Sequence, residues 1–476
     1  MRSADCWGAW RAGTQRRSAR KRGYRCPEPV PGPRTRRPLM SARHQGAASV
    51  DATSSLRRVL GLTEVTAGGV GIIIGAGIYV LLGAATAHAG PLVWAAFLFA
   101  AVLSALTGFS YAELSSMFPS AAGEYEYTRR ALPEWVAFGV GWTMILGLVV
   151  AAATVSIGFG RYVHYFIQID SRVAALGLLA AVCVIALVGV KQSARLIVGL
   201  SAVQVGGLVL VIAIGAPHVG EVDLFTGPGV AGVLGAAALV FFAFIGFDEV
   251  ITLAEETRDP TRTVPRALLL ALGLSTILYI AVAVAAVSVL GAEALAASPR
   301  PLADVMAHVL GHRGATVVAA IAVMTTTNTT LLAVTAGSRV IYGMGRAGAL
   351  PRALAAVHPT RGTPVRAIIV AVLVAAAFAG LGEFTVIAAV TDFAVYVVFL
   401  AVNATVIILR RTHPETPRPF AVSGAIHGIP IVPILGLASV GLMMIQLEPL
   451  AASLGATLCG VGLGAGWLTS ALRRPT

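Results

Sequence analysis

Long apolar stretches of about 20 residues, the length that one helical crossing needs, recur along almost the whole chain after residue 60. The strands of a membrane β-barrel would alternate apolar and polar residues, whereas the stretch from Ala174 to Val190 is apolar on every face. The chain is therefore predicted to be an all-α membrane protein with about twelve transmembrane helices. The predicted spans are 64–83, 91–117, 134–165, 173–190, 194–216, 230–255, 266–290, 314–342, 364–382, 385–410, 429–446 and 449–470.

The composition agrees with a chain that is surrounded by a lipid bilayer. Of the 476 residues, 57% are hydrophobic and 12% are charged, which leaves too little polar surface to cover a soluble globule. The formal charge of +13 does not indicate nucleic acid as a partner, because the basic residues beyond the first 43 follow the membrane topology. With a cytoplasmic N-terminus, nineteen of them lie in inner segments and four in outer ones. The positive-inside rule predicts a multi-pass cell-membrane protein with both termini cytoplasmic.

The first 55 residues differ from the rest. They are rich in Arg, Pro and Ser and have no periodic apolar pattern, so residues 1–55 are predicted to be a disordered basic tail. The tail is either an anchor for anionic lipids or a segment without transport function, such as an over-extended start upstream of Met40. Cys6 and Cys26 lie in the tail, while Cys183 and Cys459 lie in apolar runs. Their spacing predicts no disulfide framework and no metal site.

Two spans are interrupted by residues that a simple crossing helix avoids. The first contains six glycines, including Gly75 and Gly77, and each costs about 1 kcal/mol in a helix interior relative to alanine. In the sixth span, Gly246 is followed by Asp248 and Glu249, and carboxylates at membrane depth are costly enough to suggest a function. Both helices are predicted to break, over 74–77 and 244–247.

The positions of these spans suggest internal symmetry. Spans one and six are the first members of two successive sets of five helices, and broken helices at matching places indicate an inverted repeat with a binding site between its halves. The alternative for the first span is close helix packing through small residues.

Several motifs carry a resemblance to a known family. They are Gly75-Ala76-Gly77-Ile78, Tyr111-Ala112-Glu113-Leu114, Gly141-Trp142, Phe244 to Asp248, Asn328-Thr329-Thr330 and Arg418-Pro419-Phe420. By the order and spacing of these motifs between Leu60 and Arg418, the chain resembles amino acid permeases of the amino acid-polyamine-organocation (APC) transporter superfamily.

The resemblance implies a leucine-transporter-type fold. Residues 56–420 would form a five-plus-five inverted-repeat transport core, and residues 421–476 two peripheral helices. The backbone N–H groups at the first break would hold a substrate carboxylate, and carbonyls around Gly246 would receive its ammonium group. Phe244 and Phe247 would face the substrate side chain. The predicted substrate site comprises Ile74, Gly75, Ala76, Gly77, Phe244, Ile245, Gly246, Phe247 and Asp248.

Three carboxylates allow more than one interpretation. Glu113 is expected to pair with a basic loop at a helix end. Asp248 is expected mainly to cap the second half of the sixth helix, and could also contact substrate. Asp392 is either a protonatable group within the membrane or a residue at the water interface.

The sequence does not determine which ion drives transport. Some proton-coupled relatives carry a lysine in span five and a glutamate in span three, where this chain has Gln204 and Gly147. Because glutamine cannot titrate, that mechanism is in doubt. A sodium site could form from Gly71, Ile74, Thr326 and Thr327, although a Ser/Thr-rich helix that packs against its neighbours explains the same residues.

The predicted function is secondary active transport of amino acids by alternating access. The nearest alternative is a transporter or exchanger of polyamines or other organic amines. A channel would need a continuous polar pore lining, and an enzyme would need a set of catalytic or metal-binding side chains; neither pattern is present in the sequence. No cofactor is predicted. Three alternatives for coupling stay open: sodium, a proton carried by a carboxylate such as Asp392 or Asp248, and simple exchange without a coupling ion.

Overall fold

The computed structural model describes residues 60–119, 123–188, 194–359, 361–381, 383–426 and 429–472. These residues all belong to the second of two units, Met1–Ser55 and Leu56–Thr476. The tail that the sequence predicts to be disordered lies outside the described residues. The two units are therefore not placed relative to each other here.

The described residues are almost entirely helical, as the sequence predicts. Each of the twelve predicted spans coincides with helical structure, so the all-α membrane fold class is confirmed. Within the described ranges, nine helical segments are long and apolar enough to cross a membrane. Three shorter apolar helices accompany them, at Leu62–Ile73, Val365–Leu381 and Ile431–Gln446. The helices are α1 (Leu62–Ile73), α2 (Gly77–Ala89), α3 (Val93–Met117), α4 (Gly123–Ala131), α5 (Glu134–Val163), α6 (Ser171–Val188), α7 (Ala194–Gly215), α8 (Gly229–Val240), α9 (Pro260–Leu290), α10 (Ala292–Ala297), α11 (Pro301–Arg346), α12 (Val365–Leu381), α13 (Phe384–Thr412), α14 (Ile431–Gln446) and α15 (Pro449–Leu472).

Shorter elements connect these helices. Five 3-10 helices are described: η2 (Gly90–Leu92), η3 (Ala216–His218), η4 (Phe241–Phe244), η5 (Asp248–Glu256) and η6 (Arg352–Ala355). Strands β1 (Ala425–Ile426) and β2 (Ile429–Pro430) pair antiparallel before α14. Glycine 311, with φ of 66°, produces a kink in the long helix α11.

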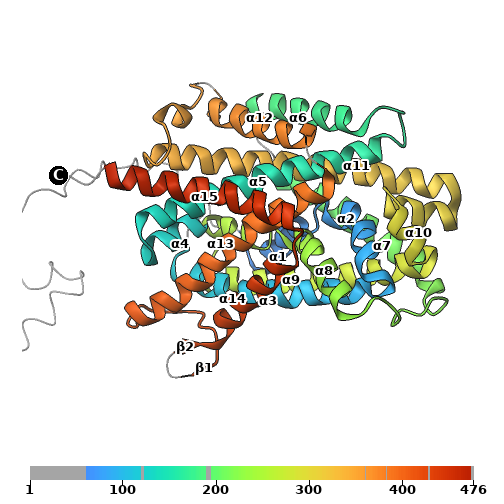
Figure 1. The fold of residues 1–476 in the computed structure, drawn as a ribbon, viewed down its shortest axis with the longest axis horizontal. Helices are drawn as coiled ribbons and strands as arrows, with labels where there is room; N and C mark the ends of the chain where they lie inside the picture. The colour runs from blue at the N-terminus through green and yellow to red at the C-terminus, as the bar shows by residue number, and fades with distance from the viewer. Residues whose placement is uncertain are drawn as a thin grey trace, which may run out of the picture. The chain divides into compact units, whose positions relative to one another are not determined.

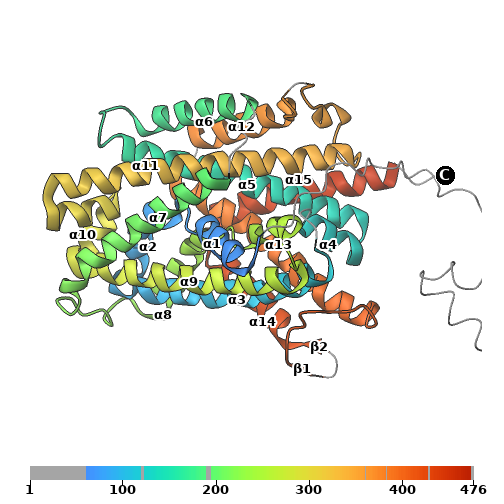
Figure 2. The same ribbon diagram turned by 180° about the vertical axis from the view of Figure 1, so that it is seen from behind.

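Helix α5 lies in the interior of the bundle and packs against α11, α13, α6 and α15 (Figures 1 and 2). Helices α6 and α12 lie side by side at one edge, and α3 packs along α9. Helix α1 lies near the centre of both views, and α2 packs against α8. The bundle therefore surrounds the two breaks with helices on several sides.

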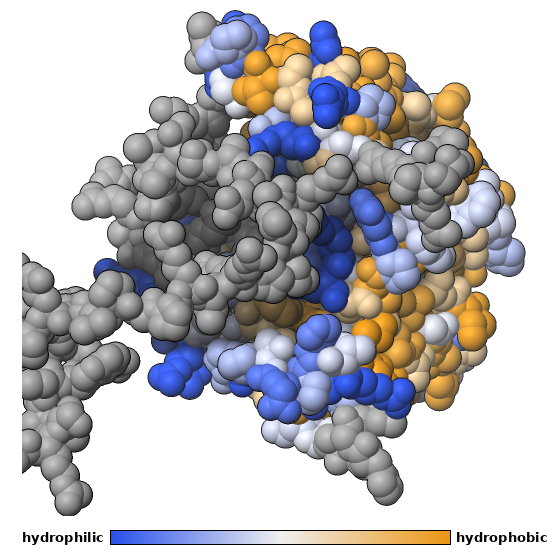
Figure 3. Space-filling model, turned by 90° about the vertical axis from the view of Figure 1, so that its left-hand side faces the viewer, coloured by the Kyte–Doolittle hydropathy of each residue, from blue (hydrophilic) through white to orange (hydrophobic). Residues whose placement is uncertain are grey.

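Large apolar side chains are exposed on the outward faces of the peripheral helices. Ile277 on α9 and Leu373 on α12 are 66% and 63% exposed. Exposed apolar area of this kind is unfavourable in water and requires no compensation in hydrocarbon. Figure 3 shows one end of the molecule, where hydrophilic residues gather in the middle of the uncovered surface and hydrophobic residues line its flank. This distribution is that of a protein solvated by lipid around its sides.

Candidate substrate site at two interrupted helices

The first break separates α1 from α2. Helix α1 ends at Ile73 and α2 begins at Gly77, so 74–76 are not helical. Ile74 has φ of −76° and ψ of 69°, and the Gly75 N–H donates to the Ile73 carbonyl at 2.7 Å. The first N–H groups of α2 have no acceptor within their own helix, and they carry the positive end of its dipole. The predicted interruption at 74–77 is confirmed to within one residue.

The second break separates η4 from η5. Ile245 has φ of −56° and ψ of 133°, and Gly246 has φ of +113°. Only glycine adopts that φ without strain, so the backbone itself requires Gly246. The Asp248 carboxylate accepts a hydrogen bond from the Gly246 N–H at 3.0 Å. The interruption predicted over 244–247 is thus confirmed, with 245–247 as its non-helical residues.

The capping role expected for Asp248 is wrong in its geometry. The residue that precedes η5 is Phe247, and no side chain caps it. Asp248 is instead the first residue of η5, and its carboxylate reaches backward to the Gly246 N–H. This bond closes the turn and satisfies one backbone donor that the break would otherwise leave free.

One side chain ties the two breaks together. The Tyr279 hydroxyl on α9 is 2.7 Å from the carbonyl of Ile73, the last residue of α1, and 2.9 Å from the carbonyl of Ala243 in η4. Tyr279 is fully buried, and its ring lies edge-on to Phe244 with centroids 5.3 Å apart. Both breaks therefore share one anchor on an uninterrupted helix.

A cavity of about 70 Å³ lies between the breaks. Helices α5 and α11 complete its walls. The lining residues are Gly71, Ile72, Ile73, Gly75, Ala76, Gly77, Leu148, Ala151, Val155, Phe242, Ala243, Ile245, Gly246, Glu249, Asn328, Thr329, Leu332 and Ala333. Most of this wall is apolar or backbone, and Glu249 is the ionisable residue in it. Few polar groups in an apolar concavity are typical of small-molecule sites.

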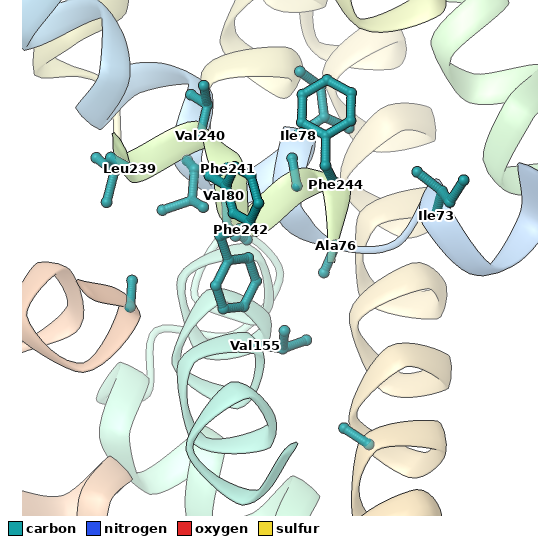
Figure 4. Close-up of a cluster of buried hydrophobic side chains, with 14 of the residues drawn as sticks. Ile73, Ala76, Ile78, Val80, Val155, Leu239, Val240, Phe241, Phe242 and Phe244 are labelled. Carbon is teal, nitrogen blue, oxygen red and sulfur yellow. The ribbon is translucent and has the colours of Figure 1, made fainter. Parts of the chain in front are cut away.

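Five of the nine predicted site residues line this cavity: Gly75, Ala76, Gly77, Ile245 and Gly246. The other four, Ile74, Phe244, Phe247 and Asp248, are not among the lining residues. Figure 4 shows why for Phe244: Phe242 points toward Val155 on α5, whereas Phe244 points to the opposite side of its segment. Phe247 packs on Phe399 at 5.2 Å between ring centroids. As the structure stands, Phe242 is the phenylalanine that faces the cavity.

Residues on α5 and α11 were missed by the sequence reasoning. Leu148, Ala151 and Val155 look like any other part of an apolar span, and nothing in the sequence marks their inward face. Asn328 and Thr329 were available from the motif Asn328-Thr329-Thr330, where an amide within an apolar helix is itself a signal.

The four residues considered for an ion site occupy different environments. Gly71 lines the cavity, whereas Ile74, Thr326 and Thr327 do not. The Thr326 hydroxyl donates to Ala322 O and the Thr327 hydroxyl to Val323 O, each at 2.7 Å. Each hydroxyl thus donates its hydrogen to a carbonyl of its own helix and keeps its oxygen lone pairs as acceptors. Within the described part of the chain, no group of three His, Cys, Asp or Glu side chains is placed to hold a metal.

A buried carboxyl lies outside the membrane spans. Glu124 on α4 is 3% exposed. Burial, and then the charge of Asp248, raise the pKa of Glu124 to about 8. No motif in the sequence singles out this residue. Its electrostatic interaction with Asp248 links the α4 segment to the second break.

Glu113 forms the ionic contact that the sequence predicts. Its buried carboxylate accepts hydrogen bonds from Arg410 Nε and the Val422 N–H, both at 2.9 Å, and contacts Arg410 Nη2 more closely. Arg418 Nε lies 3.4 Å from the same carboxylate. The residue therefore joins α3 to the end of α13 and the segment that follows it.

Asp392 is buried inside the bundle and is not in contact with water. It is the ninth residue of α13 and is 0% exposed, so its placement at a water interface is wrong. The other interpretation, a carboxyl within the membrane, is the one that the structure supports.

These features define the class of the protein: an α-helical membrane transporter with a cavity between two interrupted helices. Comparison with known proteins agrees, because the model of the amino acid permease family matches residues 60–453. The chain belongs to the amino acid permease family.

The names of similar proteins refer to different substrates. The branched-chain amino acid permease of Bacillus subtilis (strain 168) is 31% identical over 82% of this chain and 88% of its own length. The methylthioribose transporter of the same organism is 31% identical over the same shares of the two chains. A vacuolar cationic amino acid transporter of Arabidopsis thaliana is 29% identical over 77% of this chain and 65% of its own.

Proposed function

We propose that this protein is a secondary active transporter of amino acids that carries its substrate unchanged across the cell membrane. The observation that carries the proposal is the cavity between the two breaks, which offers opposite electrostatic ends to one zwitterion. Family membership and the names of two similar proteins support an amino acid as the substrate.

The α2 end of the cavity suits a carboxylate. Gly75, Ala76 and Gly77 line it, and the backbone N–H groups that begin α2 have no acceptor within that helix. A helix N-terminus favours an anion through these donors and through its dipole. Gly75 allows a ligand to come close to the backbone, and Gly77 allows α2 to begin directly against Ala243 of η4.

The opposite side suits an ammonium group. The segment from Phe242 to Gly246 leaves regular α-helix, and Glu249 lines the same cavity. A charge-assisted hydrogen bond of an ammonium to a carboxylate is about twice as strong as a neutral one. Leu148, Ala151 and Leu332 then form an apolar surface for the substrate side chain.

The membrane arrangement is also part of the proposal. Both termini are placed in the cytoplasm, as the bias of basic residues supports. Residues 56–420 form the inverted-repeat transport core, and 421–476 contain the two peripheral helices α14 and α15. Ile74, Phe244, Phe247 and Asp248 act from outside the cavity wall by holding the breaks in shape.

A ligand screen tests this function. The purified protein is heated with each proteinogenic L-amino acid, with the amine that lacks its carboxyl group, and with the keto acid that lacks its ammonium. A ligand that binds the folded state raises the melting temperature. We expect a shift with one chemical group of amino acids and none with the matched amine or keto acid.

Counterflow in proteoliposomes then separates transport from binding. Preloading with the amino acid that shifts the melting temperature should stimulate saturable uptake of the labelled compound. An equal shift by amines alone, or uptake that does not saturate, would contradict the proposal.

A further inference from the structure

Asp392 is a buried carboxyl group on α13. It is fully buried, and neither carboxyl oxygen has a hydrogen-bond partner among the residues that the structure describes. The hydroxyl of the neighbouring Thr391 donates to the Ile387 carbonyl of the same helix at 3.2 Å, and so does not donate to Asp392. An ionised carboxylate in such surroundings is highly unfavourable, and a protonated one much less so.

Glu113 shows how this fold treats a carboxylate that stays ionised. It is 1% exposed, nearly as buried as Asp392, yet two arginines and a backbone N–H surround it. The same helix, α13, supplies Arg410 to that cluster. Glu113, which contacts α13, and Asp392, which belongs to α13, are thus both buried but have opposite electrostatic environments. The environment of Asp392 fits the neutral acid.

A divalent metal ion is a poorer occupant than a proton. Calcium and magnesium take several oxygen ligands at once. Asp392 belongs to no group of three acidic, histidine or cysteine side chains within the described ranges. The ionisable group that interacts with it electrostatically is Tyr396, one turn along the same helix.

The face of α13 that carries Asp392 contacts the sixth span before its break and at Phe247, the last residue of the break. Tyr396 and Phe399 follow Asp392 at intervals of four and three residues, so the three share one face. The Tyr396 hydroxyl donates to the Ala238 carbonyl of α8 at 3.1 Å. The Phe399 ring packs on Phe241 and on Phe247, with centroids 5.8 and 5.2 Å apart. The face of α13 that carries Asp392 therefore packs on segments next to the cavity.

We propose that Asp392 is the proton-binding site that couples transport to a proton gradient. In the conformation described here the carboxyl is neutral and the face of α13 is closed on the sixth span. The carboxyl takes up its proton from water on one side of the membrane before α13 and the sixth span close. It releases the proton to water on the other side when these segments separate toward that side. One such cycle moves one proton with each substrate. The inference rests on the proposed function.

Accumulation under a pH gradient tests the inference. Proteoliposomes receive a radiolabelled mixture of the proteinogenic L-amino acids, with the membrane potential held at zero by potassium and valinomycin. One proton per zwitterion and one pH unit support at most about a tenfold concentration ratio. The parent should accumulate substrate toward this limit. Asp392→Asn, which keeps the neutral shape but cannot release a proton, should equilibrate substrate without accumulation.

Controls separate failure of this inference from failure of the proposed function. Counterflow exchange, measured without a pH gradient, should persist in Asp392→Asn. Asp223→Asn removes an exposed carboxylate and should accumulate substrate like the parent. Asp392→Glu retains a titratable group and should recover part of the accumulation.

Four outcomes overturn the proposal: a parent that exchanges but never accumulates under the pH gradient, Asp392→Asn that accumulates as the parent does, Asp392→Asn that loses exchange, or Asp392→Asn that melts at a lower temperature. The second outcome would place the proton elsewhere, with Glu124 as the next group to change. Absence of binding and exchange in the parent would instead contradict the proposed function.

Discussion

The two breaks interrupt their helices for different physical reasons. At the first break, glycine provides space: a Cβ on Gly77 would lie 2.6 Å from Ala243 Cα. At the second, glycine provides conformation, because Gly246 has φ of +113°. Charge differs as well, since Asp248 and Glu249 follow the second break and no carboxylate accompanies the first. The first break thus offers the N–H groups that begin α2 and no carboxylate, whereas two carboxylates follow the second.

The largest effect is expected for Gly77→Val. The Cβ would also lie 2.9 Å from Ala243 Cβ, and the obstructing atoms belong to backbone or to a short side chain that cannot rotate away. We expect loss of detectable amino acid binding and a reduction in unfolding free energy of about 1–3 kcal/mol from overpacking. Thermal-shift titration measures both.

Its matched control is Gly273→Val on α9, where an added Cβ meets no atom within 4 Å. That variant should bind like the parent. If Gly77→Val also binds the amino acid with parental affinity, the close approach of the first break to Ala243 is not needed for substrate binding.

Gly246→Ala is expected to have the next largest effect. An alanine at positive φ is strained by about 1–3 kcal/mol, so the second break should change shape and substrate affinity should fall at least about tenfold. Gly380→Ala on α12 is the control, because it has open space around it and no positive φ. Equal affinity of Gly246→Ala and the parent, by isothermal titration, would mean that the conformation at Gly246 is not needed for binding.

Glu249→Gln tests the charge difference between the breaks. Loss of the carboxylate from the cavity should weaken amino acid binding by about 1.5–3 kcal/mol, the usual worth of a charged hydrogen bond. The exposed Glu221→Gln is the control. The melting temperature of Glu249→Gln without ligand should equal that of the parent; a lower value would show general damage to the cavity.

Tyr279→Phe is expected to have the smallest effect of the four. Removal of the hydroxyl leaves the Ile73 and Ala243 carbonyls without that partner, which should lower stability by about 1–3 kcal/mol. Because the ring packing on Phe244 persists, binding should weaken only a few-fold. Chemical unfolding with and without ligand measures the two effects separately. A stability equal to that of the parent would show that the shared anchor does not hold the breaks.

Much of the fold could be predicted because lipid imposes a simple rule on each crossing segment. Every predicted span became helix, and glycine with polar residues located both breaks. The sequence could not indicate which face of an unbroken helix looks inward, because Val155 on α5 and Val184 on α6 are chemically alike, yet only Val155 lines the cavity. Phe244 and Phe247 show the same limit: their position beside the break was predicted, but their direction depends on 3-10 geometry that periodicity does not reveal.

The most direct test of the central claim is backbone hydrogen exchange with and without the amino acid that gives the largest thermal shift. If one substrate bridges both breaks, exchange should slow in peptides that cover 71–80 and 241–250 together. Gly77→Val should show no slowing in either peptide at the same ligand concentration. Slowing in only one of the two peptides of the parent, or in neither, would contradict a site formed by both interrupted helices.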